Sequence, residues 1–555
     1  MSNQIPLQGG YTGDFDSQQS YDLLIKVKPD DENFVVIGGI NLYRSTDGFT
    51  TTENTSWIGG YSPLNDTYDF YTNHHADQHS LVFYKSNTNK VIVGHDGGLS
   101  RTNDISANGV DTEVVDWLKL NRGYLTTQAY TVAIPTMYTT ASRKKNSSFD
   151  LVLAGFQDNG TWATKSMDGA VNWEKRLSGD GSYCALGMNS SFSSSQNGTV
   201  YGDFYDFHGF YDYWTRVDPE GATGQLFITP FILDPNNNNV MYYAGGDIIW
   251  RNSDLTEIPS KSDNPASTNW FEMSNSGVSG STITAIDVSQ NPLNILYYGT
   301  ANAKLFKIID ALNGDPLPID ITGSNLPPGN IGCVMVNPSD TSELFTTFTN
   351  YKIISIWHSK DGGISWESIS GNLEDNPDGS GNGPSIRWIS MMRLATNSYI
   401  YFVGTSTGLF STTNLDGDNT VWLQEGENTI GNVVVNMVKT GNVGEVVVAT
   451  HANGIYSAQY DVDVHVSDIQ GVEELGVEVF PNPSNGVFNI KITGTNAKDY
   501  RISIYNMLGK AVYFSEQKNV MSVNEQINLQ THAKGVYNIE IVSNKGVHSF
   551  KHILK

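Results

Sequence analysis

The sequence predicts an all-β protein, with a large β-propeller of seven to nine blades followed by a small β-sandwich. Three observations support this prediction. A pattern of strand, turn and strand recurs nine times before residue 460, no sustained apolar period of 3.6 residues is present, and the last eighty residues contain short alternating runs. The 54 glycines and the aromatic content of 11% are typical of a folded, turn-rich β protein.

Each repeat begins with an apolar run that ends in a turn of small residues, and a second apolar run follows. The first and last of these turns are 412 residues and eight intervals apart, which gives about 52 residues per repeat. A period of this length predicts propeller blades of four strands, with an inner strand ahead of each run, as in Thr282–Val288. The nine turns lie at Gly38, Gly94, Gly155, Gly202, Gly245, Gly299, Thr347, Gly404 and Thr450.

Nine copies fit two arrangements. One is a single ring of eight or nine blades, and the other is a complete ring of seven blades plus part of a second ring. We expect the propeller over residues 1–459, a linker over 460–475 and the sandwich over 476–555. The first ten residues contain neither the basic nor the apolar stretch of a signal peptide, so we expect an N-terminally incomplete fragment.

Some repeats contain a serine–aspartate hairpin. The segment Ser359–Trp366 follows the pattern S-x-D-x-G-x-x-W, in which serine and aspartate bond the turn, glycine permits a positive φ and tryptophan packs underneath. This resembles the Asp-box (BNR-repeat) propellers, which include sialidases, sortilin-type receptors and xyloglucanases. The resemblance implies a fold and not an activity. Its structural residues are Ser359, Asp361, Gly363 and Trp366, with a degraded copy at Ser166, Asp168 and Trp173 and another at Ser45 and Asp47.

The C-terminal eighty residues form a module of their own. Alternating runs such as Val487–Ile492 and Val536–Ile541 predict six or seven short strands of an antiparallel sandwich. The opening Phe480-Pro-Asn-Pro-Ser-Asn-Gly486 and the closing Lys534-Gly-Val-Tyr537 resemble the type A C-terminal sorting domain of the type IX (Por) secretion system of Bacteroidetes. The resemblance implies contact with the type IX secretion machinery and delivery to the cell surface or the medium.

The charge balance supports this division. From residue 476 onward nine Lys/Arg and five Asp/Glu give a net charge of +4, whereas the whole chain has −25, so the first 475 residues have −29. The acidic excess disfavours nucleic acid as a partner, and no apolar run approaches the roughly 18 residues of a membrane helix. We expect Cys184 and Cys333 to be small buried residues, with a disulfide between them as the alternative.

The densest polar cluster is His74–His79, followed by His95 and Asp96. If this segment is extended, His75, Asp77 and His79 share one face and could bind a metal or a substrate at the channel mouth. The alternative is a hydrogen-bonded network that joins blades.

Further polar turns carry carboxylates beside glycines, at Gln157–Gly160 and Gly179–Gly181. Turn chemistry explains them simply, because Asp and Asn bond turn backbone. The sharper interpretation is an acid/base pair for glycoside hydrolysis, which needs two carboxyl groups roughly 5 to 10 Å apart. The candidates for that pair are Asp77, Asp96, Asp158 and Asp180, with His75, His79, His95 and Gln157 as ligand contacts.

The segment Asp203–Trp214 is unusually aromatic. Its rings Tyr205, Tyr211 and Trp214 could stack on sugar faces, and the alternative is ordinary blade core. Two acidic loops offer oxygens to calcium, although neither has EF-hand spacing. The residues of these weak calcium candidates are Asp375, Asp378, Asp416 and Asp418.

These observations favour a secreted or outer-membrane surface-attached propeller protein that binds glycans or peptides. The alternative is a secreted glycoside hydrolase that uses a carboxylate pair. No P-loop, GxSxG or HExxH motif is present, and no spacing among the arginines singles out the triad that a sialidase needs.

Overall fold

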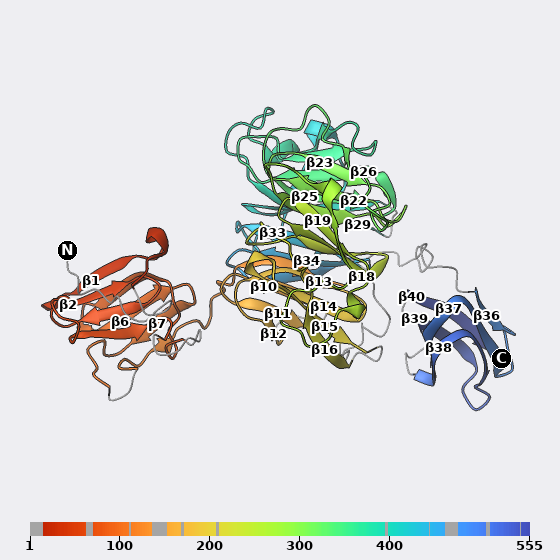
Figure 1. Cartoon of the computed structure of the whole chain (residues 1–555), viewed down its shortest axis with the longest axis horizontal. Helices are drawn as coiled ribbons and strands as arrows, with labels where there is room; N and C mark the ends of the chain where they lie inside the picture. Colours follow the sequence, from red (N-terminus) through yellow and green to blue (C-terminus); the bar gives the residue numbers. More distant parts are fainter. Residues whose placement is uncertain are drawn as a thin grey trace. The chain divides into compact units, whose positions relative to one another are not determined.

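The computed structural model describes residues 15–62, 70–109, 113–135, 152–167, 171–206, 210–394, 398–442, 444–460, 476–506, 511–543 and 546–555. The chain divides into two units, Met1–Thr127 and Gln128–Lys555. Figure 1 shows strands throughout both. The predicted boundaries at 459 and 475 stay predictions, and the predicted linker lies almost wholly outside the described residues.

The first unit contains two four-stranded antiparallel sheets in chain order (Figure 1). They pack through one apolar cluster, which includes Val36 and Ile58 from the first sheet and Val91 and Val93 from the second. Each sheet therefore resembles a propeller blade. The strands are β1 (Leu24–Lys28), β2 (Asp31–Gly38), β3 (Leu42–Ser45) and β4 (Thr55–Gly59), then β5 (Gln78–Tyr84), β6 (Asn87–His95), β7 (Gly98–Thr102) and β8 (Leu118–Lys119).

The second unit begins with seven antiparallel sheets, each built from consecutive strands. The first three are β9 (Ala129–Ala133), β10 (Val152–Phe156), β11 (Gly160–Thr164) and β12 (Glu174–Leu177); β13 (Gly181–Leu186), β14 (Ser190–Ser195), β15 (Val200–Tyr205) and β16 (Tyr211–Arg216); and β17 (Phe231–Asp234), β18 (Asn237–Gly245), β19 (Ile248–Asn252) and β20 (Trp270–Met273).

The remaining four sheets continue the same order. They are β21 (Ile283–Val288), β22 (Leu296–Thr300), β23 (Leu305–Ile308) and β24 (Ile319–Asp320); β25 (Ile331–Asn337), β26 (Asp340–Phe348), β27 (Ile356–Ser359) and β28 (Glu367–Ser368); β29 (Ile386–Arg393), β30 (Tyr399–Thr405), β31 (Gly408–Thr412) and β32 (Leu423–Glu425); and the three-stranded β33 (Val435–Thr440), β34 (Glu445–Thr450) and β35 (Ile455–Gln459).

The seven sheets close into a ring. Strand β9 contacts both β33 and β34. The Asn436 side-chain amide donates to the Ala129 carbonyl at 2.8 Å, and Gln128 forms an isolated antiparallel bridge with His451. The first and seventh sheets thus join without sharing a strand.

The nine predicted copies correspond to nine sheets, seven in the ring and two in the first unit. This agrees with the predicted ring of seven blades plus further blades, and the alternative of one ring of eight or nine blades is wrong. Eight of the nine predicted turn residues are the last or next-to-last residue of the second strand of a sheet, but Gly202 lies in β15, a third strand. The second strand there is the serine-rich β14, whose sequence has no continuous apolar run.

Tryptophans fill the space between neighbouring sheets near their outer strands. Trp366, just before β28, donates its indole N–H to the Ile321 carbonyl, which follows the outermost strand of the preceding sheet, at 2.9 Å. Ahead of Trp366, the Ser359 hydroxyl accepts the Gly363 N–H at 2.9 Å, and Asp361 accepts the Ser365 N–H at 2.9 Å. The hairpin therefore holds the indole in place. Asp168 of the degraded copy lies outside the described residues, whereas Ser166 and Trp173 flank it.

The C-terminal residues form one five-stranded sheet that curls around its own core. Its two ends meet where the Ser484 N–H donates to the Ile553 carbonyl at 2.9 Å. The prediction of six or seven short strands is wrong, because the runs around Ile490 and Ile502 belong to one long strand. The strands are β36 (Gly476–Phe480), β37 (Val487–Asn506), β38 (Ala511–Asn528), β39 (Gly535–Ser543) and β40 (Gly546–Leu554).

Both cysteines are free and buried, so the alternative of a disulfide is wrong. Burial raises the pKa of each thiol, Cys184 and Cys333, to about 12, which leaves them unreactive. Among the described residues, no helix has the length and apolar character needed to cross a bilayer.

We expect Trp366→Ala to lower the free energy of unfolding of the ring by about 3–5 kcal/mol, because a 4% exposed indole and its hydrogen bond are lost. Denaturant unfolding followed by fluorescence measures this loss. Ile364→Ala, in the same hairpin but 79% exposed, is the matched control and should change stability by less than about 0.5 kcal/mol. Equal effects of the two variants would contradict the packing role of the indole.

Candidate functional sites

A cluster of neutral histidines lies in the first unit. The rings of His74 and His95 are 4.8 Å apart, and His74 also packs on Trp117 at 4.4 Å. Burial lowers the pKa of His74 well below its usual value and that of His95 to about 3. Because the Ser100 hydroxyl donates to the Asn73 carbonyl, it accepts the Nε2–H of His95 at 2.8 Å. These contacts hold His74 and His95 in the neutral form.

The predicted extended segment through His75, Asp77 and His79 is interrupted. Asp77 has a φ of 64° and β5 begins only at Gln78, so the chain bends just before the strand. His75 instead packs on Phe70, with ring centroids 4.6 Å apart. The three side chains therefore do not share one strand face.

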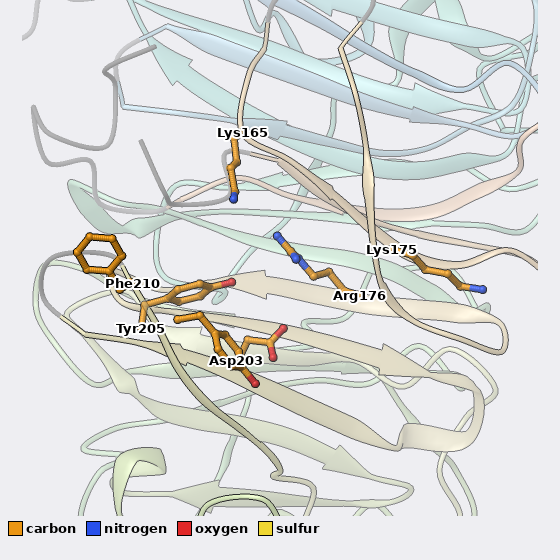
Figure 2. Close-up of a pocket in the computed structure, with 7 residues that line it drawn as sticks. Lys165, Lys175, Arg176, Asp203, Tyr205 and Phe210 are labelled. Carbon is orange, nitrogen blue, oxygen red and sulfur yellow. The ribbon is translucent and has the colours of Figure 1, made fainter. Parts of the chain in front are cut away.

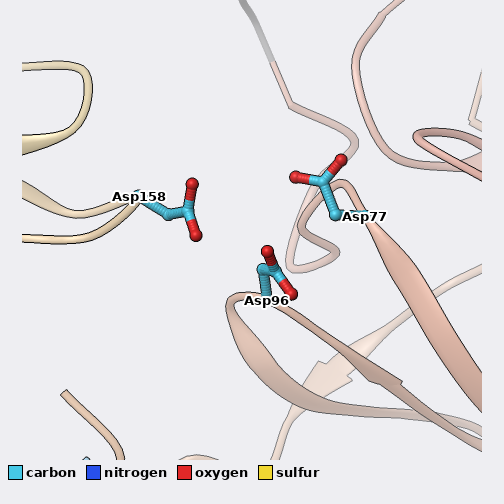
Figure 3. Close-up of side chains that lie close together, drawn as sticks. All are labelled: Asp77, Asp96 and Asp158. Carbon is cyan, nitrogen blue, oxygen red and sulfur yellow. The ribbon is translucent and has the colours of Figure 1, made fainter. Parts of the chain in front are cut away.

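Two of the predicted aspartates come together in the first unit. Asp77 precedes β5 and Asp96 follows β6, and their carboxylate oxygens lie within 4.8 Å of one another (Figure 3). Asp96 bonds to Nε2 of His79, and Asp77 accepts the Gln18 side-chain amide at 3.1 Å. The ring of Tyr21 packs edge-on against His79 at 5.1 Å.

Asp22 lies close enough to Asp96 and His79 for their charges to affect it, and it is not among the residues predicted from the sequence. It is fully buried, and neither of its carboxylate oxygens has a hydrogen-bond partner among the described residues. Burial raises its pKa to about 6, the charge of His79 lowers it, and the charges of Asp16 and Asp96 raise it further. Its position directly before the apolar run of β1 was the one available signal in the sequence.

The other two predicted aspartates form a link between the first two sheets of the ring. The Asp158 N–H donates to the Asp180 carboxylate at 2.8 Å, and the Asp180 N–H donates to the side-chain carbonyl of Gln196 at 3.0 Å. Gln157 donates its backbone N–H to the Gln128 carbonyl at 3.0 Å. Asp180 thus serves as a hydrogen-bond acceptor for a neighbouring turn, and a catalytic role for either residue stays a prediction.

A pocket of about 420 Å³ opens between the outer strands of the first two sheets of the ring (Figure 2). Asp203 and Tyr205 alternate along β15 and therefore share one face of it. Phe210 lies just before β16 and Tyr211 begins this strand, and the two residues are 66% and 56% exposed. The pocket is lined by Lys165, Lys175, Arg176, Asp203, Tyr205, Phe210 and Tyr211.

The pocket combines rings with charges of both signs. The rings of Tyr205 and Tyr211 meet edge to face at 6.2 Å. Arg176 lies 3.3 Å and Lys165 4.0 Å from the carboxylate of Glu174. The basic side chains come from a different sheet than the aromatic ones, so their proximity could not be found from sequence spacing.

The remaining predicted contacts lie outside this pocket. Trp214 packs against Tyr201 with ring centroids 6.0 Å apart and does not line the pocket. Among the candidate calcium residues, Asp375 accepts the Asn382 N–H and Asp378 accepts the Ser380 N–H. Within the part of the chain that the structure describes, none of Asp375, Asp378, Asp416 and Asp418 lies in a group of three His, Cys, Asp or Glu side chains that could hold a metal ion.

We expect the first unit to lose stability as the pH falls from about 6.5 toward 3. An unfolded histidine takes up a proton near pH 6.5 and folded His95 only at about 3, so acid favours unfolding by at most about 1.4 kcal/mol per pH unit. His95→Asn should flatten the pH dependence of the unfolding midpoint, measured by hydrogen exchange of residues 24–119. His532→Asn, at an exposed position of the C-terminal sheet, is the control. If the unfolding midpoint of His95→Asn depends on pH as steeply as that of the parent, the lowered pKa of His95 is not the cause of the acid sensitivity.

Comparisons with known proteins identify the C-terminal residues 478–555 and give structural neighbours of low similarity for the rest of the chain. No curated protein matches the chain. The GH74 xyloglucanase from Xanthomonas campestris is 13% identical with a TM-score of 0.47, covering 81% of this chain and 60% of its own. The GH74 enzyme of Niastella koreensis is 14% identical with a TM-score of 0.42, covering 80% and 60%. YCF48 from Cyanidioschyzon merolae is 8% identical with a TM-score of 0.41, covering 60% and 96%.

The chain thus spans about 60% of the length of the two GH74 proteins. Residues 478–555 match the model of the secretion system C-terminal sorting domain family, Por_Secre_tail. The chain therefore ends in a type IX sorting domain, a signal for export that implies a secreted or cell-surface protein.

Proposed function

We propose that this chain is an exported propeller protein that binds glycans through the pocket between the first two sheets of its ring. The observation that carries the proposal is the set of three aromatic rings around an open pocket, of which Phe210 and Tyr211 are exposed and Tyr205 is partly buried. A volume of about 420 Å³ lies within the range of roughly 300–1,000 Å³ typical of small-molecule sites.

The side chains of the pocket suit a sugar ring. The apolar faces of Tyr205 and Tyr211 can pack on the C–H face of a pyranose, and a tyrosine hydroxyl can form hydrogen bonds with sugar hydroxyls. The Tyr205 hydroxyl also lies 3.4 Å from the hydroxyl of Ser191. Asp203 on the same face of β15 provides a carboxylate that accepts hydrogen bonds from sugar hydroxyls. Because these residues lie on strands of a closed ring, little conformational entropy is lost on binding.

The rest of the chain supports an extracellular role. The sorting domain gives the route of export, and the net charge of −25 keeps an exported protein soluble by repulsion. The bonds of Ser359 and Asp361 within their hairpin support placing the ring among the Asp-box propellers, whose members differ widely in activity.

Glycoside hydrolysis is the second candidate function, and one observation favours it. The carboxylate oxygens of Asp77 and Asp96 lie within 4.8 Å, near the separation of about 5–5.5 Å in retaining glycosidases. Both groups, however, already accept hydrogen bonds from neighbouring side chains, Gln18 and His79. We therefore favour binding.

Substituting both tyrosines, Tyr205→Ala with Tyr211→Ala, should weaken glycan binding by about tenfold or more, because each stacked ring contributes roughly 0.5–1.5 kcal/mol. Calorimetric titration of the full chain with oligosaccharides measures this. Tyr351→Ala, at a 58% exposed tyrosine outside the pocket, is the matched control and should bind as the parent does. Absence of any glycan binding by the parent, or selective binding of peptides, would contradict the proposal.

We expect no release of reducing ends when the full chain is incubated with a panel of polysaccharides. Reducing-sugar assays of the parent, Asp77→Asn and Asp96→Asn measure it. Turnover by the parent that either substitution abolishes, with the fold unchanged in circular dichroism, would replace the binding proposal by the hydrolase.

A further inference from the structure

The sheets of the ring fan outward from its axis, so neighbouring sheets separate toward their outer strands and leave a wedge-shaped space. At three of these wedges an indole fills the space in the same way. Its N–H donates to the carbonyl of the residue that follows the outermost strand of the preceding sheet. The pairs are Trp270 with Val217 at 2.8 Å, Trp366 with Ile321 at 2.9 Å and Trp422 with Ile369 at 2.9 Å.

A different group closes the wedge before the fourth sheet. There the side chain of Arg251, in β19 of the third sheet, donates to two carbonyls between β23 and β24 of the fourth sheet. The distances are 2.7 Å to the Ala311 carbonyl and 3.0 Å to the Gly314 carbonyl. Trp173, just before β12, packs in the apolar cluster that the first and seventh sheets share. These wedges are therefore filled by a side chain of the protein itself.

The wedge between the first and second sheets departs from this pattern. The residue just before its outermost strand, β16, is Phe210, which is 66% exposed instead of inserted. The pocket occupies this wedge, with Lys165 and Arg176 on one side and Asp203 and Tyr205 on the other. Among the described residues, no indole closes this wedge as one does in the three wedges above.

The open wedge also gathers positive charge on an acidic chain. Lys165, Lys175 and Arg176 all line it, although the chain carries 58 acidic and only 33 basic residues. Lys165 lies 4.0 Å and Arg176 3.3 Å from the carboxylate of Glu174, which is itself exposed. In Figure 2 the Lys165 ammonium and the Arg176 guanidinium point into the space beside Tyr205.

We propose that this wedge selects acidic glycans, in which sugar rings carry carboxylate or sulfate groups. The inference rests on the proposed function and narrows its ligand class. A planar guanidinium binds carboxylate and sulfate oxygens through paired hydrogen bonds, and an ammonium adds a second positive contact. The tyrosine rings pack on the sugar face, while Lys165 and Arg176 bind the anionic substituent of the sugar. Asp203 accepts a hydrogen bond from a sugar hydroxyl.

The first experiment compares three oligosaccharides of equal length in titrations with the full chain: an oligogalacturonate, a sulfated oligogalactan and a neutral oligogalactan. We expect at least one acidic oligosaccharide to bind about tenfold more tightly than the neutral one, since charge-assisted hydrogen bonds are roughly twice as strong as neutral ones. Comparing the affinities of the oligogalacturonate and the sulfated oligogalactan shows whether the wedge prefers carboxylate or sulfate groups. The preference should shrink as salt rises, because the cations are solvent-accessible.

Variants test whether residues of the wedge cause the preference for acidic oligosaccharides. Lys165→Gln with Arg176→Gln should abolish the preference for acidic ligands while binding of the neutral oligosaccharide persists. Lys304→Gln, at an exposed lysine of the fourth sheet, is the matched control and should keep the preference. Equal affinity for all three ligands, or a preference unchanged in the double variant, overturns the inference and leaves glycan binding intact. Failure of all three ligands to bind overturns the proposed function itself.

A second variant tests the wedge directly. Phe210→Trp places an indole where three other sheets have one, so we expect it to occupy the pocket and to abolish binding of acidic and neutral ligands alike. The thermal midpoint should not fall. Unchanged binding in a variant that remains folded by near-ultraviolet circular dichroism would overturn the assignment of the site to this wedge.

Discussion

Closure of the seven-sheet ring is the constraint on which the rest of the structure depends. A repeat of about 52 residues supplies each sheet, but only contact between the first and last sheets turns an arc into a ring. That contact rests on β9 packing against β33 and β34, with the Asn436–Ala129 hydrogen bond and the Gln128–His451 bridge. Because no strand is exchanged, side chains and backbone polar groups at one seam hold the ring together.

Closure has a geometric consequence that connects fold to function. Sheets that meet at an axis must diverge at the periphery, and apolar surface in the resulting wedges needs to be covered. Tryptophan suits this task because it is large and its N–H can satisfy a backbone carbonyl. A wedge without such a side chain is a ready-made pocket on a rigid frame, and the first wedge of this ring combines that opening with tyrosines and cations. The binding site that we propose is thus a wedge that lacks the indole found in three others.

Much of the fold could be predicted from the sequence, and less of the sites. The repeated apolar runs are local, so eight of nine second strands were found, whereas β14 escaped because serines replace its apolar residues. The tail motif identified the sorting domain, but two separate runs could not show that β37 is continuous. Tyr205 and Tyr211 were found because they lie in one short aromatic stretch of the sequence. Lys165 and Arg176 were not predicted as pocket residues, because their approach to the tyrosines depends on how two sheets pack. Asp22 was not predicted either, because a sequence does not show whether a buried carboxylate has a hydrogen-bond partner.

Ring closure can be measured with a disulfide across the seam. In the antiparallel bridge Gln128 and His451 have Cα atoms about 4.5–5.5 Å apart, within the roughly 4.4–6.8 Å that a disulfide spans. The account predicts that Gln128→Cys with His451→Cys forms an intramolecular disulfide in dilute monomeric protein, with Cys184 and Cys333 too buried to compete. Mass spectrometry of peptides from the oxidised protein detects the bond. Free thiols at both introduced cysteines, or only intermolecular crosslinks between them, would contradict a closed ring of seven sheets.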